Sequence, residues 1–228
     1  MYFSLITPAA GRERDAAHQW AGGPYIEHQW LWQFFPAAKG SPRDFLYRRS
    51  DKEGMPKFYV VSKRPPQAQS TAWSIQTQPY APKLGVGERL HFDLRANPVV
   101  AVSNGGKSRR HDVVMQEKTR LLRERGMTRW QDWQSDEKPA LYHLVHDACS
   151  AWLKSRALRS GFELDDETLS VEAYEQHAEK NGGLKFSTAD FSGSLIVTEP
   201  AAFSGALCDG IGHAKAFGCG LLLVRRHS

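Results

Sequence analysis

The chain has 228 residues, enough for one large domain or two small ones, and its 30 Lys and Arg against 25 Asp and Glu give a net charge of +5. This charge is a mild bias towards anionic partners, and alone it does not identify a nucleic-acid-binding protein. No apolar run approaches the roughly 20 residues that a membrane helix needs, and the N-terminus lacks the basic and long apolar segments of a signal peptide, so we expect a cytoplasmic protein without membrane association.

The first part of the chain predicts several strands and one helix. Alternating apolar and polar residues predict a strand from Met1 to Ala9, and the polar, glycine-containing residues 10–23 predict a loop. A helix is predicted over residues 25–35, because Pro24 suits its first turn and Pro36 marks its end. Three further strands are predicted, with the first two paired around a turn, over residues 43–48, 57–62 and 73–77.

A second unit begins near Gly85. Its first part begins with a strand-like stretch over residues 90–102 and a glycine turn rich in basic residues over 104–111. Two helices are predicted next, over residues 115–125 and 139–158. Two strands, a short helix and a last strand follow over residues 162–174, 184–197, 200–209 and 218–225.

Each half therefore has the order strand, helix, strand, strand, helix, strand, which is the order of the ferredoxin-like βαββαβ fold. In the first half the second helix is unclear, because residues 65–72 are few and rich in proline. We predict an α+β protein of two tandem ferredoxin-like domains, over residues 1–84 and 85–228.

The most distinctive segment lies at the C-terminal end, where four glycines and one lysine occupy residues 210–220, directly before an apolar strand. Dense glycines allow a close approach by another chain, and successive backbone N–H groups with Lys215 suit an anionic partner. A nucleotide-binding P-loop is a poor interpretation, since its strand comes first, a helix follows and its sequence ends in G-K-[ST]. A tight turn that packs a helix end against a strand is the structural interpretation, and it is compatible with anion binding.

This segment, G-I-G-x-A-K-x-F-G-C-G-L-L, resembles the C-terminal loop of the CRISPR repeat-processing endoribonucleases, and most closely that of the CasE family. Two further motifs carry the resemblance: Tyr25-x-x-His28-x-x-Leu-Trp-x-x-Phe-Pro and Leu-Arg-Ala-Asn-Pro at residues 94–98. It covers nearly the whole chain and is weakest over residues 125–182.

The resemblance implies two tandem ferredoxin-like domains and a metal-independent endoribonuclease. Its substrate would be the repeat stem-loop of precursor CRISPR RNA, cut at the 3′ base of the stem to leave a 2′,3′-cyclic phosphate and a 5′-OH. Members of the family stay on their product as a subunit of the type I-E Cascade complex. The implied partners are therefore the CRISPR repeat RNA stem-loop and the other Cascade subunits.

By the same resemblance His28 is the catalytic residue and Tyr25 lies beside it. The two residues are one helical turn apart and share a face. RNA carries its own nucleophile, the 2′-OH, so cleavage needs a base, an acid and stabilisation of the phosphate charge, and histidine titrates in the useful range. The role of His28 as base or acid stays open, and the alternative is a structural histidine packed beside Trp32.

The RNA-binding candidates are mostly basic. In the glycine turn a basic finger can bind phosphates along the rim of the deep major groove of A-form RNA, and the alternative is an ordinary solvated loop. His213 stands where the family commonly has proline, and it is either an RNA contact or a tolerated substitution. The full set of predicted RNA-binding residues is Lys39, Arg43, Lys107, Arg109, Arg110, Lys185, Gly210, Gly212, His213 and Lys215.

No metal site or cofactor is predicted. His143, His146 and Asp147 lie together on a predicted helix, but no second ligand cluster accompanies them. The three scattered cysteines form no C-x-x-C pair, which favours reduced thiols that bind no metal. Two other functions stay open: a non-catalytic RNA-hairpin-binding subunit of a ribonucleoprotein complex, and a metal-dependent nuclease.

Overall fold

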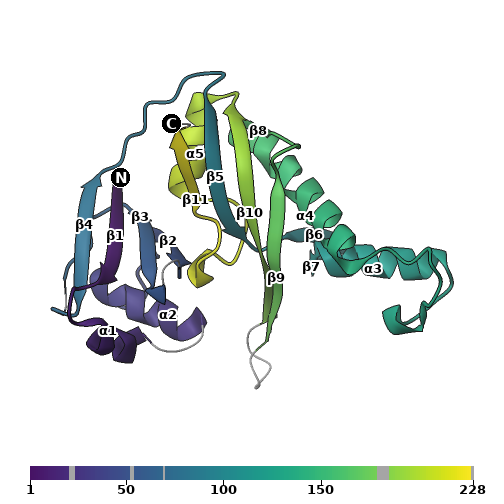
Figure 1. Cartoon of the computed structure of the whole chain (residues 1–228), viewed down its shortest axis with the longest axis horizontal. Coiled ribbons are helices and arrows are strands. Elements are labelled where there is room, and N and C mark those ends of the chain that lie inside the picture. Colours follow the sequence, from purple (N-terminus) through teal and green to yellow (C-terminus); the bar gives the residue numbers. More distant parts are fainter. Residues whose placement is uncertain (21–23, 52–53, 69, 179–184, 227–228) are drawn as a thin grey trace.

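The computed structural model describes residues 1–20, 24–51, 54–68, 70–178 and 185–226. Two antiparallel sheets stand side by side, each with helices on one face, and a two-stranded hairpin projects near the second sheet (Figure 1). The mixture of helices with antiparallel sheets confirms the predicted α+β class.

The first sheet has the strand order β2-β3-β1-β4, which is the ferredoxin-like order. Its strands are β1 (Tyr2–Pro8), β2 (Phe45–Ser50), β3 (Lys57–Ser62) and β4 (Trp73–Pro79). Between β1 and β2 the chain forms α1 (Glu13–Trp20), α2 (Pro24–Leu31) and the 3-10 turn η1 (Trp32–Phe34). The described residues between β3 and β4 form no helix, as the short proline-rich segment indicated.

The second sheet has the order β11-β5-β10-β8, and β9 also pairs with β10. Its strands are β5 (Arg89–Ala96), β8 (Phe162–Leu164), β9 (Ser170–Ala178), β10 (Lys185–Val197) and β11 (Leu222–Arg226). Because β8 and β9 pair with successive parts of β10, they act as two segments of one strand, so this order is again ferredoxin-like.

The helices of the second half lie between these strands in sequence. Before β8 come α3 (Val113–Glu124), η3 (Trp130–Asp132), α4 (Leu141–Ala157) and η4 (Leu158–Ser160). After β10 come α5 (Pro200–Asp209) and η5 (Lys215–Phe217), which is a 3-10 turn inside the C-terminal glycine-rich loop. No helix in the described ranges is long and apolar enough to cross a membrane.

Each sheet has its own apolar core. Aromatic rings dominate the first core, where the ring centroids of Trp30 and Trp73 lie 4.4 Å apart and both side chains are buried. A third, smaller cluster joins Leu46 and Val61 of the first sheet to Leu221, next to the last strand. This cluster brings the glycine-rich loop against β2, so residues from both ends of the chain meet at one site.

Three predicted elements were wrong. The single strand expected over residues 162–174 is divided into β8 and β9, because residues 165–168 form a turn in which Thr168 N–H donates to the Asp165 carbonyl at 3.2 Å. Residues 10–23 were expected to form a loop, but α1 forms over residues 13–20, because Ala16 is fully buried and the first turn carries Glu13 and Asp15, which favour a helix N-terminus. Residues 21–23 of this prediction lie outside the described residues. The strand expected over 90–102 is broken after Ala96: Asn97 and Pro98 separate β5 from β6 (Val99–Asn104). With β7 (Lys107–Asp112), β6 forms a hairpin that carries the basic turn predicted at 104–111.

The linker between the sheets runs from the end of β4 at Pro79 to the start of β5 at Arg89. The predicted domain boundary at residues 84 and 85 falls inside it and stays a prediction.

Candidate active site

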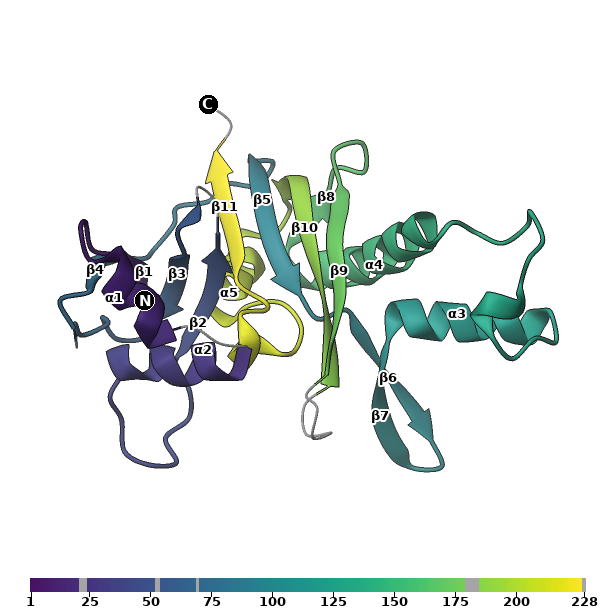
Figure 2. The ribbon, with the colours of Figure 1, turned by 60° about the horizontal axis from the view of Figure 1, so that its bottom comes forward.

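Helix α2 lies next to the glycine-rich loop (Figure 2) and carries both predicted catalytic residues, of which His28 contacts the loop residue Phe217. Its centre is held by Glu27, which is buried and accepts a hydrogen bond from Arg49 Nη1 at 3.1 Å. The neighbouring His28 is half-buried, and Tyr25, one turn earlier, is 51% exposed. The helix therefore presents a partly shielded imidazole and an accessible phenol to the same surface.

His28 is fixed by aromatic neighbours. Trp32 Nε1 donates to His28 Nε2 at 3.2 Å, and the Phe217 ring lies 6.2 Å from the imidazole centroid. Because an indole N–H only donates, Nε2 is the acceptor, and a neutral His28 carries its proton on Nδ1. Burial, together with the positive charge of Arg43, lowers the pKa of His28 below its ordinary value. His28 is therefore neutral at pH 7, with its lone pair on Nε2.

The contact with Trp32 was the structural alternative for His28, and the structure contains it. A packed imidazole and a reactive imidazole are compatible here, because the ring remains only half-buried. Tyr25 is held more loosely: its hydroxyl accepts one hydrogen bond from Gln29 Nε2 at 3.1 Å and keeps its own proton for donation.

The glycine-rich loop after α5 is a closed, internally bonded structure. Ile211 N–H donates to the Gly220 carbonyl at 2.8 Å, and Tyr47 Oη donates to the Ala216 carbonyl at 3.2 Å. Gly210 has φ +74°, and a Cβ there would lie 2.9 Å from both the Gly220 oxygen and a Leu46 methyl. The tight-turn role expected for this loop is therefore present, and its contact with RNA stays a prediction.

Arg43 lies near His28, and Lys215 of the predicted set lies near Arg43. The charge of Arg43 acts on both His28 and Lys215, and one face of a cavity is lined by Arg43 and Lys215 together. Arg43 Nη1 is buried and has no hydrogen-bond partner among the described residues. Burial lowers the pKa of Lys215, Asp209 raises it and Arg43 lowers it further, while its ammonium donates to the Asp209 carbonyl at 2.6 Å. A guanidinium with an unpartnered nitrogen beside a second cation is a favourable place for a phosphate.

Basic residues of the β6–β7 hairpin lie near the glycine-rich loop. Arg109 and Arg110 are exposed on β7, where successive side chains point to opposite faces. Burial lowers the pKa of the exposed His213, and the charges of Arg110, Lys215 and Arg156 lower it further. The structure therefore brings Arg110 of the hairpin and His213 of the loop near each other.

The other predicted RNA-binding residues are more dispersed. Lys39 is exposed in the turn after η1, and Lys185 is exposed at the first position of β10. Gly212 faces the ring of Trp152, and Lys107 begins β7. None of these four has a described contact with His28, so their grouping with the catalytic candidates stays a prediction.

His143, His146 and Asp147, which were considered and not predicted as a metal site, lie on α4. His146 Nδ1 lies 3.3 Å from Asp147 Oδ1, and the His143 ring contacts Tyr142. Within the ranges that the structure describes, no group of three or more His, Cys, Asp or Glu residues could hold a metal ion.

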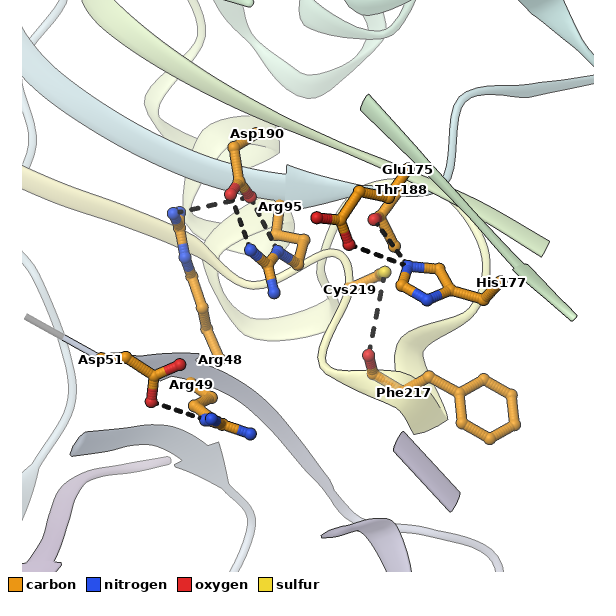
Figure 3. Close-up of polar contacts among 10 residues, drawn as sticks. All are labelled: Arg48, Arg49, Asp51, Arg95, Glu175, His177, Thr188, Asp190, Phe217 and Cys219. Carbon is orange, nitrogen blue, oxygen red and sulfur yellow. Dashed lines mark hydrogen bonds and ion pairs between the residues drawn. The ribbon is translucent and has the colours of Figure 1, made fainter. Parts of the chain in front are cut away.

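A polar cluster that sequence reasoning missed lies between the sheets (Figure 3). Arg48 and Arg95 surround Asp190, and Arg95 binds it through two hydrogen bonds of 2.8 and 2.7 Å. His177 and the glycine-rich loop residue Phe217 lie near this cluster, and the Phe217 ring also contacts the His28 ring. Arg95 belongs to the quoted Leu-Arg-Ala-Asn-Pro motif and Phe217 to the quoted glycine-rich motif, but neither was predicted as a site residue, and no local pattern singled out His177.

Known proteins resemble this chain in sequence and in fold. A family model described as "CRISPR associated protein" matches residues 1–226. The CRISPR system Cascade subunit CasE of Escherichia coli (strain K12) is 29% identical over 210 residues, which are 90% of this chain and 94% of that protein.

Two solved structures show the same fold. Thermus thermophilus Cse3, bound to an RNA representing a pre-cleavage complex, has a TM-score of 0.70 at 22% identity over 98% of both chains. Cas6e from Escherichia coli str. K-12 has a TM-score of 0.62 at 22% identity over 100% of both chains. These matches confirm the two tandem ferredoxin-like units. With the family model matching almost every residue, the chain belongs to the family of CRISPR-associated proteins.

Proposed function

We propose that this chain is a metal-independent endoribonuclease that cuts precursor CRISPR RNA at the base of the repeat stem-loop. Cleavage proceeds by attack of the 2′-OH, leaves a 2′,3′-cyclic phosphate and a 5′-OH, and the protein stays bound as a Cascade subunit. The proposal is supported by its 29% identity to a Cascade subunit and by its likeness to an RNA-bound endoribonuclease. Precursor RNA is made in the cytoplasm, where we expect the protein to act.

One observation carries the catalytic part of the proposal. His28 lies beside Arg43, whose buried Nη1 has no hydrogen-bond partner among the described residues. A neutral imidazole next to an unsatisfied guanidinium supplies a base and an anion-binding group at one place. These are two of the three groups that cleavage by a 2′-OH requires, and the third is an acid for the leaving 5′-oxygen.

In this scheme His28 is the general base. Nε2 takes the proton of the 2′-OH, the oxygen forms a bond to phosphorus, and the P–O5′ bond breaks. The leaving 5′-oxygen takes a proton, for which the Tyr25 hydroxyl and the Lys215 ammonium are the candidate donors. Arg43 and Lys215 stabilise the charge that develops on the phosphate. Because Trp32 now occupies Nε2, the 2′-OH exchanges with the indole N–H when RNA binds.

The RNA stem lies, in this proposal, over the surface formed by α2, the glycine-rich loop and the β6–β7 hairpin. Arg109 and Arg110 bind phosphates of the stem, and Lys107, Lys185, Lys39, Gly210, Gly212 and His213 complete the RNA-binding set. Most of these groups contact backbone phosphate, so they contribute affinity and position rather than sequence selection.

The test is cleavage of a labelled repeat hairpin in excess EDTA, with analysis of both new ends. A cyclic phosphate and a 5′-OH are expected. Tight binding of the hairpin without cleavage would favour the non-catalytic RNA-binding subunit, and cleavage that is lost in EDTA would favour a metal-dependent nuclease.

A further inference from the structure

A cavity of about 280 Å³ lies between α2, the end of β2, and the paired strands β9 and β10. We call it the His177 cavity; its walls include Glu27, Arg49, Arg95, Glu175, His177, Phe186 and Phe217. It reaches α2 at Glu27, the residue before His28, and the Phe217 ring on its wall also contacts the His28 ring. The cavity is therefore one aromatic ring away from the proposed catalytic base.

One wall of the cavity is a stack of three rings. His177 and Phe186, which are opposite each other in the β9–β10 pairing, have ring centroids 4.7 Å apart and an interplanar angle of 24°. Phe186 and Phe217 continue the stack at 5.1 Å and again 24°. All three side chains are only half-buried. Aromatic platforms of this kind bind unpaired bases, because every base has a π-face.

The opposite wall is polar, but its charges are already balanced (Figure 3). Arg49 is paired with Glu27 at 3.1 Å and with Asp51 at 2.7 Å. Arg95 donates to both carboxylate oxygens of Asp190, through Nε and Nη2. Compensated arginines are poor phosphate sites, and together with carboxylates they present hydrogen-bond donors and acceptors of the kind that read a base edge.

The carboxylate of Glu175 remains the most available acceptor. Its side chain is 67% exposed and lies 3.9 Å from His177 Nε2, which also makes a 2.9 Å hydrogen bond with the Thr188 hydroxyl. A carboxylate accepts hydrogen bonds from amino and imino groups of a base. This wall thus differs from the Arg43 environment, where a cation lacks a described partner.

We propose that the His177 cavity binds one unpaired base of the RNA, next to the nucleotide whose phosphate is cut. The base stacks on an end of the three-ring stack, on His177 or on Phe217, and its edge hydrogen-bonds to Glu175 and Arg49. The volume of about 280 Å³ is at the lower limit of small-ligand pockets, so it admits a single nucleoside and excludes a base pair. This inference rests on the proposed function and adds a selective site to it.

The experiment measures binding of hairpin RNAs that carry a 2′-deoxy sugar at the cut, so that they bind without being cleaved. In each RNA a single unpaired nucleotide near the cut is made abasic, on the 5′ side of the cut in one RNA and on the 3′ side in another. The wild-type protein is compared with His177→Ala and with the milder Glu175→Gln. The matched controls are His146→Ala, on α4, and Glu172→Gln, an exposed position on the same strand β9.

For the wild type, we expect one abasic position to weaken binding about tenfold or more, the usual effect of losing one stacked base. His177→Ala should bind intact and abasic RNA equally, and Glu175→Gln should discriminate between them less than the wild type does. The two controls should retain the wild-type discrimination. Thermal unfolding of each variant shows that the fold is intact.

Equal discrimination by His177→Ala and the wild type would overturn this inference, while cleavage of the ribose hairpin by the wild type would leave the proposed function standing. If the wild type neither binds nor cuts the hairpin, both this inference and the proposed function are contradicted. A His177→Ala protein that keeps its RNA discrimination but loses other Cascade subunits would show a protein contact in the cavity instead.

Discussion

Trp32 Nε1 donates a hydrogen bond to His28 Nε2 across one turn of the chain, at 3.2 Å. This contact defines the tautomer of the imidazole and occupies the nitrogen that would take the proton from the 2′-OH. It also favours the neutral ring, since an imidazolium cannot accept from the indole. Burial and Arg43 lower the pKa of His28 in the same direction.

Replacement of Trp32 by Phe should therefore shift the pH dependence of cleavage. A general base must be neutral, so kcat/KM rises with pH through the lowered pKa of His28 and is level above it. Without the indole donor, which favours the neutral ring, that pKa rises, so the acidic limb moves to higher pH. The pH–rate profile of Trp32→Phe, with Trp130→Phe as the control, measures this. An unshifted acidic limb would show that the contact does not act on the reactive nitrogen.

Arg43→Gln should reduce cleavage of bound RNA about 100-fold, because the developing phosphate charge loses a preorganised donor. It should also raise the pKa of His28, because a nearby positive charge is removed, so the acidic limb again moves to higher pH. Single-turnover rates at saturating protein measure the first effect. Arg12→Gln, which changes an exposed arginine paired with Asp15, is the control and should leave both unchanged.

The double variant Arg109→Gln, Arg110→Gln should weaken binding of the hairpin and leave single-turnover cleavage at saturation unchanged. The slope of log affinity against log salt should become shallower by about one for each phosphate that the variant no longer neutralises. Salt titrations of binding measure this slope. Arg120→Gln is the matched control, since Arg120 is already paired with Glu117 and Glu124. An unchanged slope in the double variant would remove the hairpin from the RNA path.

Gly210→Ala should destabilise the fold by several kcal/mol. The new Cβ adopts an unfavourable φ of +74° and lies 2.9 Å from the Gly220 carbonyl oxygen, so the loop must shift. Gly11→Ala is the matched control, because Gly11 has φ +77° and nothing within 4 Å of an added Cβ. Its destabilisation should be only the conformational part, about 1–2 kcal/mol. Urea unfolding of both variants gives the comparison, and equal destabilisation would show that the loop adjusts freely.

Much of the fold follows from local sequence patterns. The two series of strands and helices were predictable because alternation, prolines and glycines are local signals, and the resemblance located α2 and the glycine-rich loop. Helix α1 was missed because only Ala16 of its described side chains is buried, which leaves too weak a periodicity. The break at Pro98 was visible in the sequence, but its consequence, a separate hairpin, depends on the pairing of β6 with β7.

The site was predictable in part. The contact of Trp32 with His28 follows helical spacing and was considered as packing, whereas its effect on the tautomer needs atomic geometry. The meeting of His28, Phe217 and Phe186 was not predictable, because the three residues lie on α2, η5 and β10 and are brought together only by the packing of the two sheets. No local pattern encodes such a distant contact.

The central claim is that His28 cleaves RNA without a metal. The most direct measurement is cleavage of a repeat hairpin in EDTA by the wild type, His28→Ala and the control His18→Ala, which changes an exposed histidine of α1. The wild type and His18→Ala should produce a 2′,3′-cyclic phosphate, while His28→Ala should bind the hairpin and leave it uncut. Cleavage by His28→Ala at the wild-type rate would contradict the account.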